Sequence, residues 1–190
     1  DGYTPSSRMT AEQARDYHAV QIESFAGTAI DMVSAITMNY LEEALGIALS
    51  CKDAQVPCVI SFTVETDGHL PSGETIEEAI ARVDHHTGAY PVYYMINCAH
   101  PDHFRDKLGG NGAWKNRICG VRANASRQSH AELDACEHLD DGNPDELGRL
   151  YRDLASVLPN LSVIGGCCGT DHRHVTAMAE HALPHLHAAR

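Results

Sequence analysis

The amino-acid sequence predicts an α/β fold with a mainly parallel sheet. Short apolar runs rich in β-branched residues alternate with segments whose apolar residues recur at helical spacing, which is typical of strands joined by helical crossovers. The strand-like runs contain few polar residues, and this predicts strands that are covered on both faces. A doubly wound sheet and a barrel both fit this pattern.

Five runs predict strands, at residues 30–36, 56–64, 92–96, 118–123 and 161–164. Helical segments precede the first run, separate the runs and follow the last one. The long irregular stretch, residues 126–142, is acidic, contains histidine and directly follows a predicted strand. Such a stretch is typical either of a lid over a site or of a mobile insertion.

Capping patterns predict where four of the helices begin, because side chains at these positions satisfy the free N–H groups of a first helical turn. The starts are marked by Thr10 with Gln13, Thr75 with Glu78, Asn143 with Pro144, and Thr170 with Asp171. Gly27 is expected to close the first helix.

The composition predicts one domain over residues 1–190, because 43% apolar and 21% charged residues are ordinary values for a globular domain. A formal net charge of −12 makes nucleic acid and anionic membranes unfavourable partners. The apolar run at residues 56–64 is far shorter than the roughly 20 residues of a membrane-spanning helix, and no secretory leader opens the sequence. We therefore expect a cytoplasmic protein.

Seven cysteines show no spacing typical of small disulfide-rich secreted domains, so reduced thiols or metal thiolates are expected rather than disulfides. Free cysteine is often a small buried residue. That interpretation is expected to hold for Cys51, Cys58, Cys119 and Cys136.

Two further cysteines, Cys167 and Cys168, stand between glycines at the end of the last predicted strand. Neighbouring side chains of a regular strand point to opposite faces, but glycines allow a sharp bend that aims both sulfurs at one point. Cys98 follows an earlier predicted strand. The C-terminal ends of parallel barrel strands are where functional groups gather, so the three sulfurs are expected to converge.

Three thiolates with an open fourth position would form a catalytic zinc site, since structural zinc sites are usually closed by four protein ligands. Bound zinc would keep a substrate thiol deprotonated at neutral pH, and its sulfur could attack a methyl group in line. A disulfide between Cys167 and Cys168 is the alternative, which a reducing compartment disfavours.

Several motifs together resemble the zinc-dependent homocysteine S-methyltransferase family. They are Gly165-Gly166-Cys167-Cys168-Gly169-Thr170, Asn97-Cys98, Ser61-Phe62 and Ala123-Asn124-Ala125. The resemblance implies a (β/α)₈ TIM-barrel fold, of which residues 1–190 would be a partial barrel domain with the C-terminal five βα units. Five strands cannot close such a barrel, so the N-terminal three units are expected to be absent from this sequence.

The resemblance also implies a function. The family transfers a methyl group from S-methylmethionine, S-adenosylmethionine, betaine or a methylfolate to homocysteine, which gives methionine. By the match of motifs, Cys98, Cys167 and Cys168 would hold Zn²⁺, and no catalytic residue is expected beyond the metal centre. Asn97 and Asn124 would line the site and bind the substrate. The partners would be a small-molecule thiol, homocysteine or a related one, and a methyl donor, with self-association left open. The alternative is a non-catalytic zinc-binding barrel remnant.

The sequence departs from the family pattern at one position that concerns the substrate. Family members usually carry a glutamate near the end of the strand at residues 30–36, which holds the substrate's amino group, and here Ile36 stands in its place. Thr37, Asn39 and Glu65 are the candidates to take over that role, and we assign Thr37 and Glu65 to substrate binding.

Histidines near the cysteines are expected to have other roles than metal ligation. His172 and His174 would lie in the first turn of the last helix, where solvent-facing histidine is common. His100 and His130 are expected to line the site.

Overall fold

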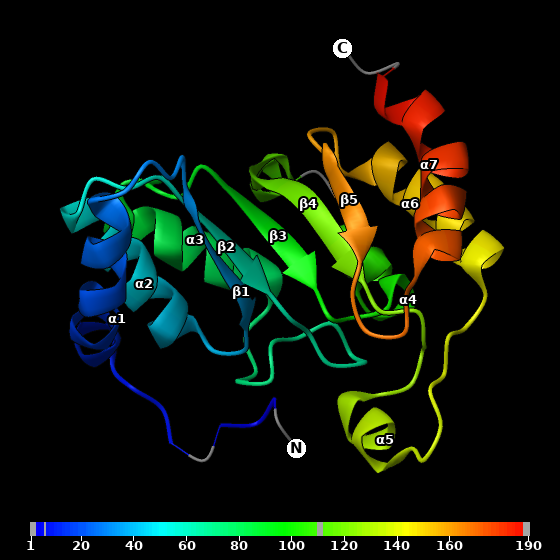
Figure 1. Ribbon diagram of the computed structural model, residues 1–190, viewed down its shortest axis with the longest axis horizontal. Coiled ribbons are helices and arrows are strands. Elements are labelled where there is room, and N and C mark those ends of the chain that lie inside the picture. The colour runs from blue at the N-terminus through cyan, green and yellow to red at the C-terminus, as the bar shows by residue number, and fades with distance from the viewer. Residues whose placement is uncertain (1–2, 6, 110–111, 188–190) are drawn as a thin grey trace.

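The computed structural model describes residues 3–5, 7–109 and 112–187, and it contains one five-stranded parallel sheet with the strand order β1-β2-β3-β4-β5 (Figure 1). The strands are β1 (Val33–Met38), β2 (Cys58–Phe62), β3 (Tyr93–Asn97), β4 (Ile118–Ala123) and β5 (Val163–Gly166). Right-handed crossovers between strands in sequential order all return on the same face of a sheet. This topology is that of a barrel wall, which decides between the two predicted architectures.

The helices and short 3₁₀ turns connect the strands in the predicted alternation. They are α1 (Ala11–Ala26), α2 (Leu41–Asp53), α3 (Ile76–Thr87), α4 (Pro101–Phe104), the 3₁₀ turns Arg105–Leu108 and Ala113–Arg117, α5 (His130–Ala135), α6 (Pro144–Val157) and α7 (His172–His187). Four strands begin later than predicted: β1 by three residues, β2 and β5 by two, and β3 by one.

The core lies between the helices and alternate residues of the strands. Ile60, Tyr94 and Val121 pack in one buried cluster with apolar residues of α2, α3 and α6. The expectation of strands covered on both faces holds for β2, in which every residue is buried. It is wrong for β1 and for β5, in which no residue is buried. Ser34 and Ile36 are exposed on β1, on the face opposite to the core.

The predicted capping patterns form as expected at three helices. Both capping boxes are present, at Thr10 and Thr75, and the Asn143 side chain accepts hydrogen bonds from the first turn of α6. At α7 the cap is Asp171, whose carboxylate accepts the Arg173 N–H over 2.9 Å.

Helix α5 was not predicted, since residues 126–142 read as irregular. The signal was present nevertheless. Ser129 accepts from the Glu132 N–H, and the Glu132 carboxylate reaches back to the Ser129 N–H over 2.8 Å, which completes a capping box. In Figure 1 the segment carrying α5 extends beyond the C-terminal ends of the strands.

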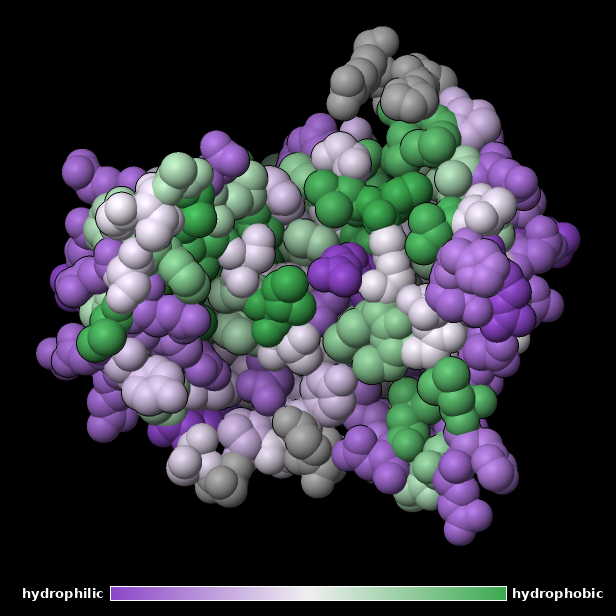
Figure 2. Space-filling model, viewed as in Figure 1, coloured by the Kyte–Doolittle hydropathy of each residue, from purple (hydrophilic) through white to green (hydrophobic). Residues whose placement is uncertain are grey.

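The outer surface is mixed in character. Figure 2 shows apolar side chains gathered over β5 and the adjoining part of α7. Val163 in β5 and Val175 and Leu183 in α7 are exposed. Among the described residues, no helix combines the length and the apolar character needed to cross a membrane.

The contact between α1 and α2 depends on a glycine, and this gives a first test of the fold. A Cβ at Gly46 would lie 2.5 Å from the Ala14 Cβ and 2.6 Å from the Ala11 carbonyl oxygen. We expect Gly46→Ala to push the two helices apart and to lower the free energy of unfolding by about 1–3 kcal/mol, measured by urea denaturation. Gly27→Ala is the matched control, because the nearest atom to its Cβ is 3.9 Å away. Equal stability of the two variants would contradict this packing.

Candidate metal centre

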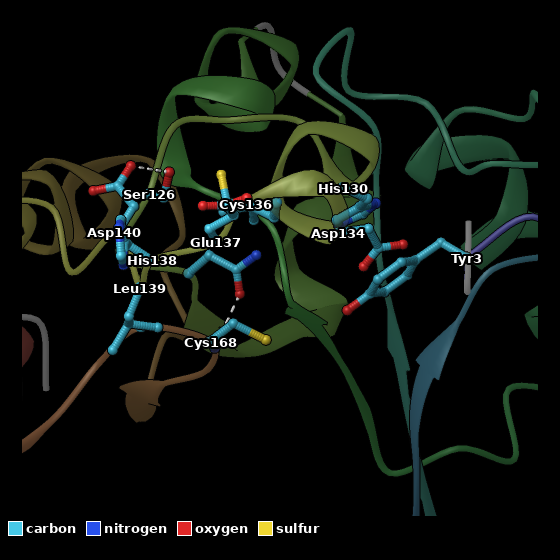
Figure 3. Close-up of a pocket in the computed structure, with 13 residues that line it drawn as sticks. Tyr3, Ser126, His130, Asp134, Cys136, Glu137, His138, Leu139, Asp140 and Cys168 are labelled. Carbon is cyan, nitrogen blue, oxygen red and sulfur yellow. Dashed lines mark hydrogen bonds between the residues drawn. The ribbon is translucent and has the colours of Figure 1, made fainter.

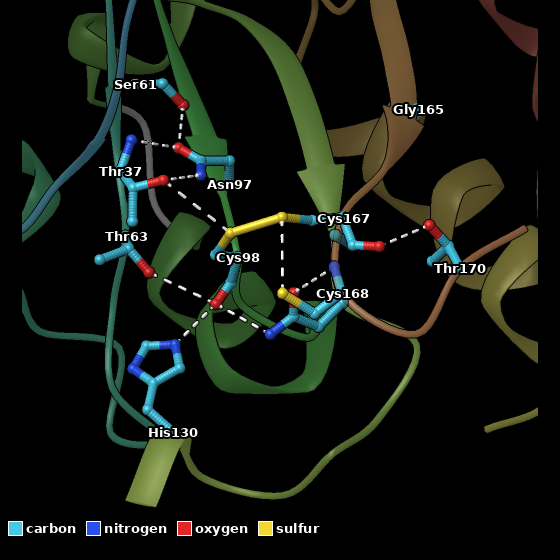
Figure 4. The surroundings of a disulfide bond; sticks show 12 residues. Thr37, Ser61, Thr63, Asn97, Cys98, His130, Gly165, Cys167, Cys168 and Thr170 are labelled. Atoms are coloured by element: carbon cyan, nitrogen blue, oxygen red, sulfur yellow. Dashed lines mark hydrogen bonds between the residues drawn. A yellow bond between two sulfur atoms is a disulfide. The ribbon is translucent and has the colours of Figure 1, made fainter. Parts of the chain in front are cut away.

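The three predicted cysteines converge at the C-terminal edge of the sheet. Cys98 directly follows β3, and Cys167 and Cys168 directly follow β5. Their three Sγ atoms all lie within 4.8 Å of one another (Figure 4). The Cys167 and Cys168 sulfurs are 4.0 Å apart.

Strand β4 sets the spacing of the two chain segments that carry these cysteines. The Cys98 N–H donates to the Arg122 carbonyl over 3.1 Å, and the Cys167 N–H donates to the Ala123 carbonyl over 2.8 Å. Cys98 and Cys167 therefore lie on opposite sides of β4, where they are bonded to two successive residues of that strand. This arrangement brings their Cα atoms to 5.5 Å.

The glycines around the cysteine pair act differently from the simple bend that was predicted. Only Gly169 among them has a positive φ, of 77°. Gly166 is required for space, because a Cβ there would meet the side chain of Thr170. The Thr170 hydroxyl in turn donates to the Cys167 carbonyl over 2.7 Å, so this residue supports the turn.

The structure joins Cys98 and Cys167 in a disulfide bond. The expectation of reduced thiols is wrong for this pair, and the predicted alternative, a bond between Cys167 and Cys168, does not form either. The reason is geometric. Two sulfurs aimed at one point from neighbouring segments lie within bonding reach of each other, so the convergence that suits a shared metal also suits a disulfide.

The donor set nevertheless fits a zinc ion. Zinc–sulfur bonds of about 2.3 Å in a tetrahedron place the sulfurs about 3.8 Å apart, close to the spacing of Cys167 and Cys168. No fourth protein ligand joins the group among the described residues. In their reduced form, the three cysteines would hold the ion with one position open.

The carbonyl oxygen of Cys98 is held by three donors. His130 Nε2 lies 2.7 Å from it, Asn124 Nδ2 donates over 3.0 Å, and the buried Thr63 hydroxyl donates over 3.4 Å. Cys98 has a left-handed backbone with φ of 55°, which is uncommon for a residue other than glycine. These contacts hold that conformation and thereby direct its sulfur.

Asn124 also connects the two segments that carry the sulfurs. Its Oδ1 accepts the Cys168 N–H over 3.1 Å while its Nδ2 donates to Cys98, and the residue is 2% exposed. The same amide therefore fixes both sides of the cluster. Asn97, also buried, contacts Thr37 through two hydrogen bonds beside the Cys98 sulfur.

A cavity of about 350 Å³ opens beside Cys168, under the segment that carries α5 (Figure 3). His130 lines it, as predicted, and its ring stacks on Tyr3 with centroids 3.7 Å apart. The Tyr3 hydroxyl points towards Cys168. Burial raises the pKa of Tyr3, and the nearby Cys168 and Asp134 raise it further, so the phenol stays protonated at neutral pH.

The other residues that the sequence analysis singled out for the site lie in different places around the cluster. Glu65 Oε1 lies 3.3 Å from His130 Nδ1, so its carboxylate is close to the cluster. Ile36 points to the inner face of the sheet and is 42% exposed. Asn39 donates to the Tyr3 carbonyl, and His100 lines a separate, smaller cavity.

Sequence reasoning missed or misplaced several residues around the site. Tyr3 belongs to no recognisable motif, and only the folded chain brings it to the cavity. His174 is fully buried rather than solvent-facing, because its ring contacts the Asp141 carbonyl over 2.8 Å and the Asp171 carboxylate over 3.1 Å. Of the four cysteines expected in the core, Cys51 and Cys58 are buried, Cys119 is only half-buried and Cys136 is exposed.

Comparisons with known proteins define the class to which this barrel wall and its cysteine cluster belong. A model of the family described as homocysteine S-methyltransferase matches residues 1–182. The chain therefore belongs to the homocysteine S-methyltransferase family. Homocysteine S-methyltransferase 1 of Arabidopsis thaliana is 23% identical over 176 residues, which cover 90% of this chain and 52% of that protein. The chain thus spans about half the length of this relative.

Solved structures agree on the fold. The homocysteine methyltransferase MmuM of Escherichia coli superposes in its metallated form with a TM-score of 0.62 and 18% identity, over 94% of this chain and 54% of that one. Its oxidized form gives a TM-score of 0.68 and 16% identity, over 95% and 56% of the two chains. Its apo form gives 0.62 and 17%, over 97% and 60%.

The role of Asn124 can be tested by stability. We expect Asn124→Asp to lower the free energy of unfolding by about 1–3 kcal/mol, because the carboxylate cannot donate to the buried Cys98 carbonyl and is repelled by it. Asn160→Asp is the matched control, since Asn160 also donates to a backbone carbonyl, that of Asn116, but is exposed. Chemical denaturation of both variants at neutral pH would measure the difference. If Asn124→Asp lost no more stability than Asn160→Asp, the proposed role of the Asn124 amide in holding the two cysteine segments would be contradicted.

Proposed function

We propose that this protein is a zinc-dependent S-methyltransferase that methylates the thiol of homocysteine or a related small molecule, with methionine as the product from homocysteine. The observation that carries the proposal is the convergence of Cys98, Cys167 and Cys168 at the C-terminal edge of a barrel wall. Functional sites of such barrels lie at this edge. The family assignment supports the same reaction.

Bound zinc would keep the acceptor thiol in its thiolate form. The protein's own residues supply the geometry. Asn124 and the donors to the Cys98 carbonyl hold the cysteine segments, and the cavity beside Cys168 holds the substrates in line. The new S–CH₃ bond forms as the donor's bond to the methyl group breaks, and the electron pair stays on the donor atom. Orientation of this kind accounts for much of an enzyme's rate.

The charge of the cavity supports a positively charged methyl donor. Asp134, Glu137 and Asp140 line it, and no lysine or arginine is among its lining residues. A sulfonium or ammonium compound is attracted by such a lining, whereas an anionic methylfolate is repelled. The partners we propose are therefore a small thiol and an onium donor, in the cytoplasm, where thiolate ligands stay reduced.

We propose further that the five βα units of residues 1–190 correspond to the C-terminal part of a family barrel. The strand order and the position of the cysteines support this correspondence. Self-association would cover the edges of β1 and β5, because unpaired strand edges recruit other chains.

The second candidate is a zinc-binding barrel remnant without catalysis, and the exposed inner face of β1 favours it. Methyl transfer by the longest natural form of the chain, assayed with zinc and a panel of thiols and onium donors, separates the two. Zinc-dependent turnover supports the enzyme. Stoichiometric zinc without turnover on any pair of substrates supports the remnant.

The metal site gives a direct prediction. After reduction we expect one zinc ion per chain, and we expect Cys168→Ser to lose both the zinc and the turnover, because a serine hydroxyl replaces a thiolate ligand. Metal analysis of the purified protein measures the first effect. Cys119→Ser is the control, since Cys119 lies in β4 outside the cluster and should keep its zinc. Full zinc content in the Cys168 variant would refute the ligand assignment.

The acceptor preference is the second prediction. With Ile36 in place of a carboxylate, the site lacks a charge-assisted hydrogen bond worth about 1.5–3 kcal/mol, or roughly 10- to 150-fold in selectivity. We expect only weak preference for homocysteine over its des-amino analogue in kcat/KM, and a sharper preference in Ile36→Glu.

Strong preference for homocysteine in the unmodified protein would contradict the role of Ile36. Glu65 would then be the residue that holds the amino group, because its carboxylate lies beside His130. In that case Glu65→Gln should abolish the preference and leave the rate with the des-amino analogue unchanged.

A further inference from the structure

The backbone of Thr37 is strained where β1 ends. Its φ is 65°, and the register of β1 against β2 shifts between Ala35 and Met38. A β-branched residue rarely adopts this left-handed conformation, because its side chain is crowded there. Such a strained conformation persists only where contacts with the surrounding structure hold the residue in it.

The contacts that fix Thr37 come from Asn97. Asn97 Oδ1 accepts the Thr37 N–H over 3.0 Å, and Asn97 Nδ2 donates to the Thr37 hydroxyl oxygen over 2.6 Å. Ser61 adds a second donor to the same Oδ1, at 2.5 Å. Because Oδ1 receives two donors, a flipped amide would place N–H against N–H, and the orientation of Asn97 is therefore determined.

The hydroxyl proton of Thr37 points to the cysteine cluster. The hydroxyl oxygen already accepts from Asn97, and its proton has the Cys98 sulfur as its acceptor, at an O···S distance of 3.9 Å (Figure 4). Asn97 is the residue directly before Cys98. The contacts thus form a closed ring, in which the neighbour of Cys98 holds the residue whose hydroxyl returns to the Cys98 sulfur.

The ring joins three strands and is partly sheltered from water. Asn97 at the end of β3 and Ser61 in β2 are each 1% exposed, and Thr37 in β1 is half-buried. A hydrogen bond in such surroundings is stronger than the same bond in water.

We propose that Thr37 is a positioning residue for the metal centre, whose hydroxyl donates to the Cys98 thiolate and fixes its direction. This inference rests on the proposed function, in which Cys98 is a zinc ligand. It also changes the interpretation of two residues that the sequence assigned to the substrate. Both oxygen lone pairs and one N–H of Asn97 are already used within the protein, as is the hydroxyl of Thr37. Thr37 and Asn97 therefore position the metal-ligating Cys98 and do not bind the substrate.

The test compares Thr37→Val, which keeps the shape and removes the hydroxyl, with Thr37→Ser, which keeps the hydroxyl. The reduced, zinc-free protein is titrated with Co²⁺ as a spectroscopic probe. We expect Co²⁺ affinity to fall about tenfold or more in Thr37→Val, as is typical when a partner of a metal ligand is lost. The thiolate-to-cobalt absorption band should move to longer wavelength, because a thiolate without its hydrogen bond gives up charge more easily. Thr37→Ser should keep both properties near those of the unmodified protein.

The outcomes separate this inference from the function on which it rests. If the unmodified protein binds no Co²⁺, the proposed metal centre fails. If it binds Co²⁺ but Thr37→Val shows unchanged affinity and an unchanged band, or if Thr37→Ser loses as much as Thr37→Val, the role of the hydroxyl is refuted. Ser61→Ala is a second variant that leaves Thr37 intact. It should weaken Co²⁺ binding in the same direction by loosening Asn97, and no effect there would count against the ring.

Discussion

The carbonyl oxygen of Cys98 is the contact on which the rest of the site depends. Its three donors come from beyond β2, from the end of β4 and from α5, so one acceptor draws together segments that are far apart in the sequence. Buried polar groups of this kind are costly unless they are paired, and this one is fully paired. The left-handed turn that aims the sulfur follows from these contacts and not from a glycine.

Much of the fold could be predicted because its signals are local. Capping boxes and apolar spacing gave α1, α3 and α6, and the GGCCGT stretch located the cysteine cluster. The remainder depends on contacts between distant residues. The strain at Thr37 is produced by Asn97, sixty positions away, and the place of Tyr3 beside the cavity follows from packing alone. Helix α5 lies between these two cases. Its capping box can be recognised in the sequence, but its six residues are too few to form a stripe of apolar side chains.

The redox state of the cluster follows from the same convergence. Side chains from both sides of β4 meet at one point, and the spacing allows either a disulfide or a shared ion. Cys168 keeps a free thiol beside the joined pair. Methyl transfer as proposed therefore requires the Cys98–Cys167 bond to be reduced, and this ties the activity to a reducing environment.

The charge of the cluster explains why an uncharged residue such as Ile36 is favourable at this position. Three thiolates on Zn²⁺ would carry a net charge of about −1, so a carboxylate at position 36 would place a second negative charge near the first unless a substrate ammonium neutralised it. With Ile36 that repulsion is absent, and the inner face of β1 is apolar at this point. The carboxylates that line the cavity come from α5 and the residues after it, at Asp134, Glu137 and Asp140. These three charges attract a cation in the cavity, which is where we propose that the methyl donor binds, and the Glu65 carboxylate lies apart from them beside His130.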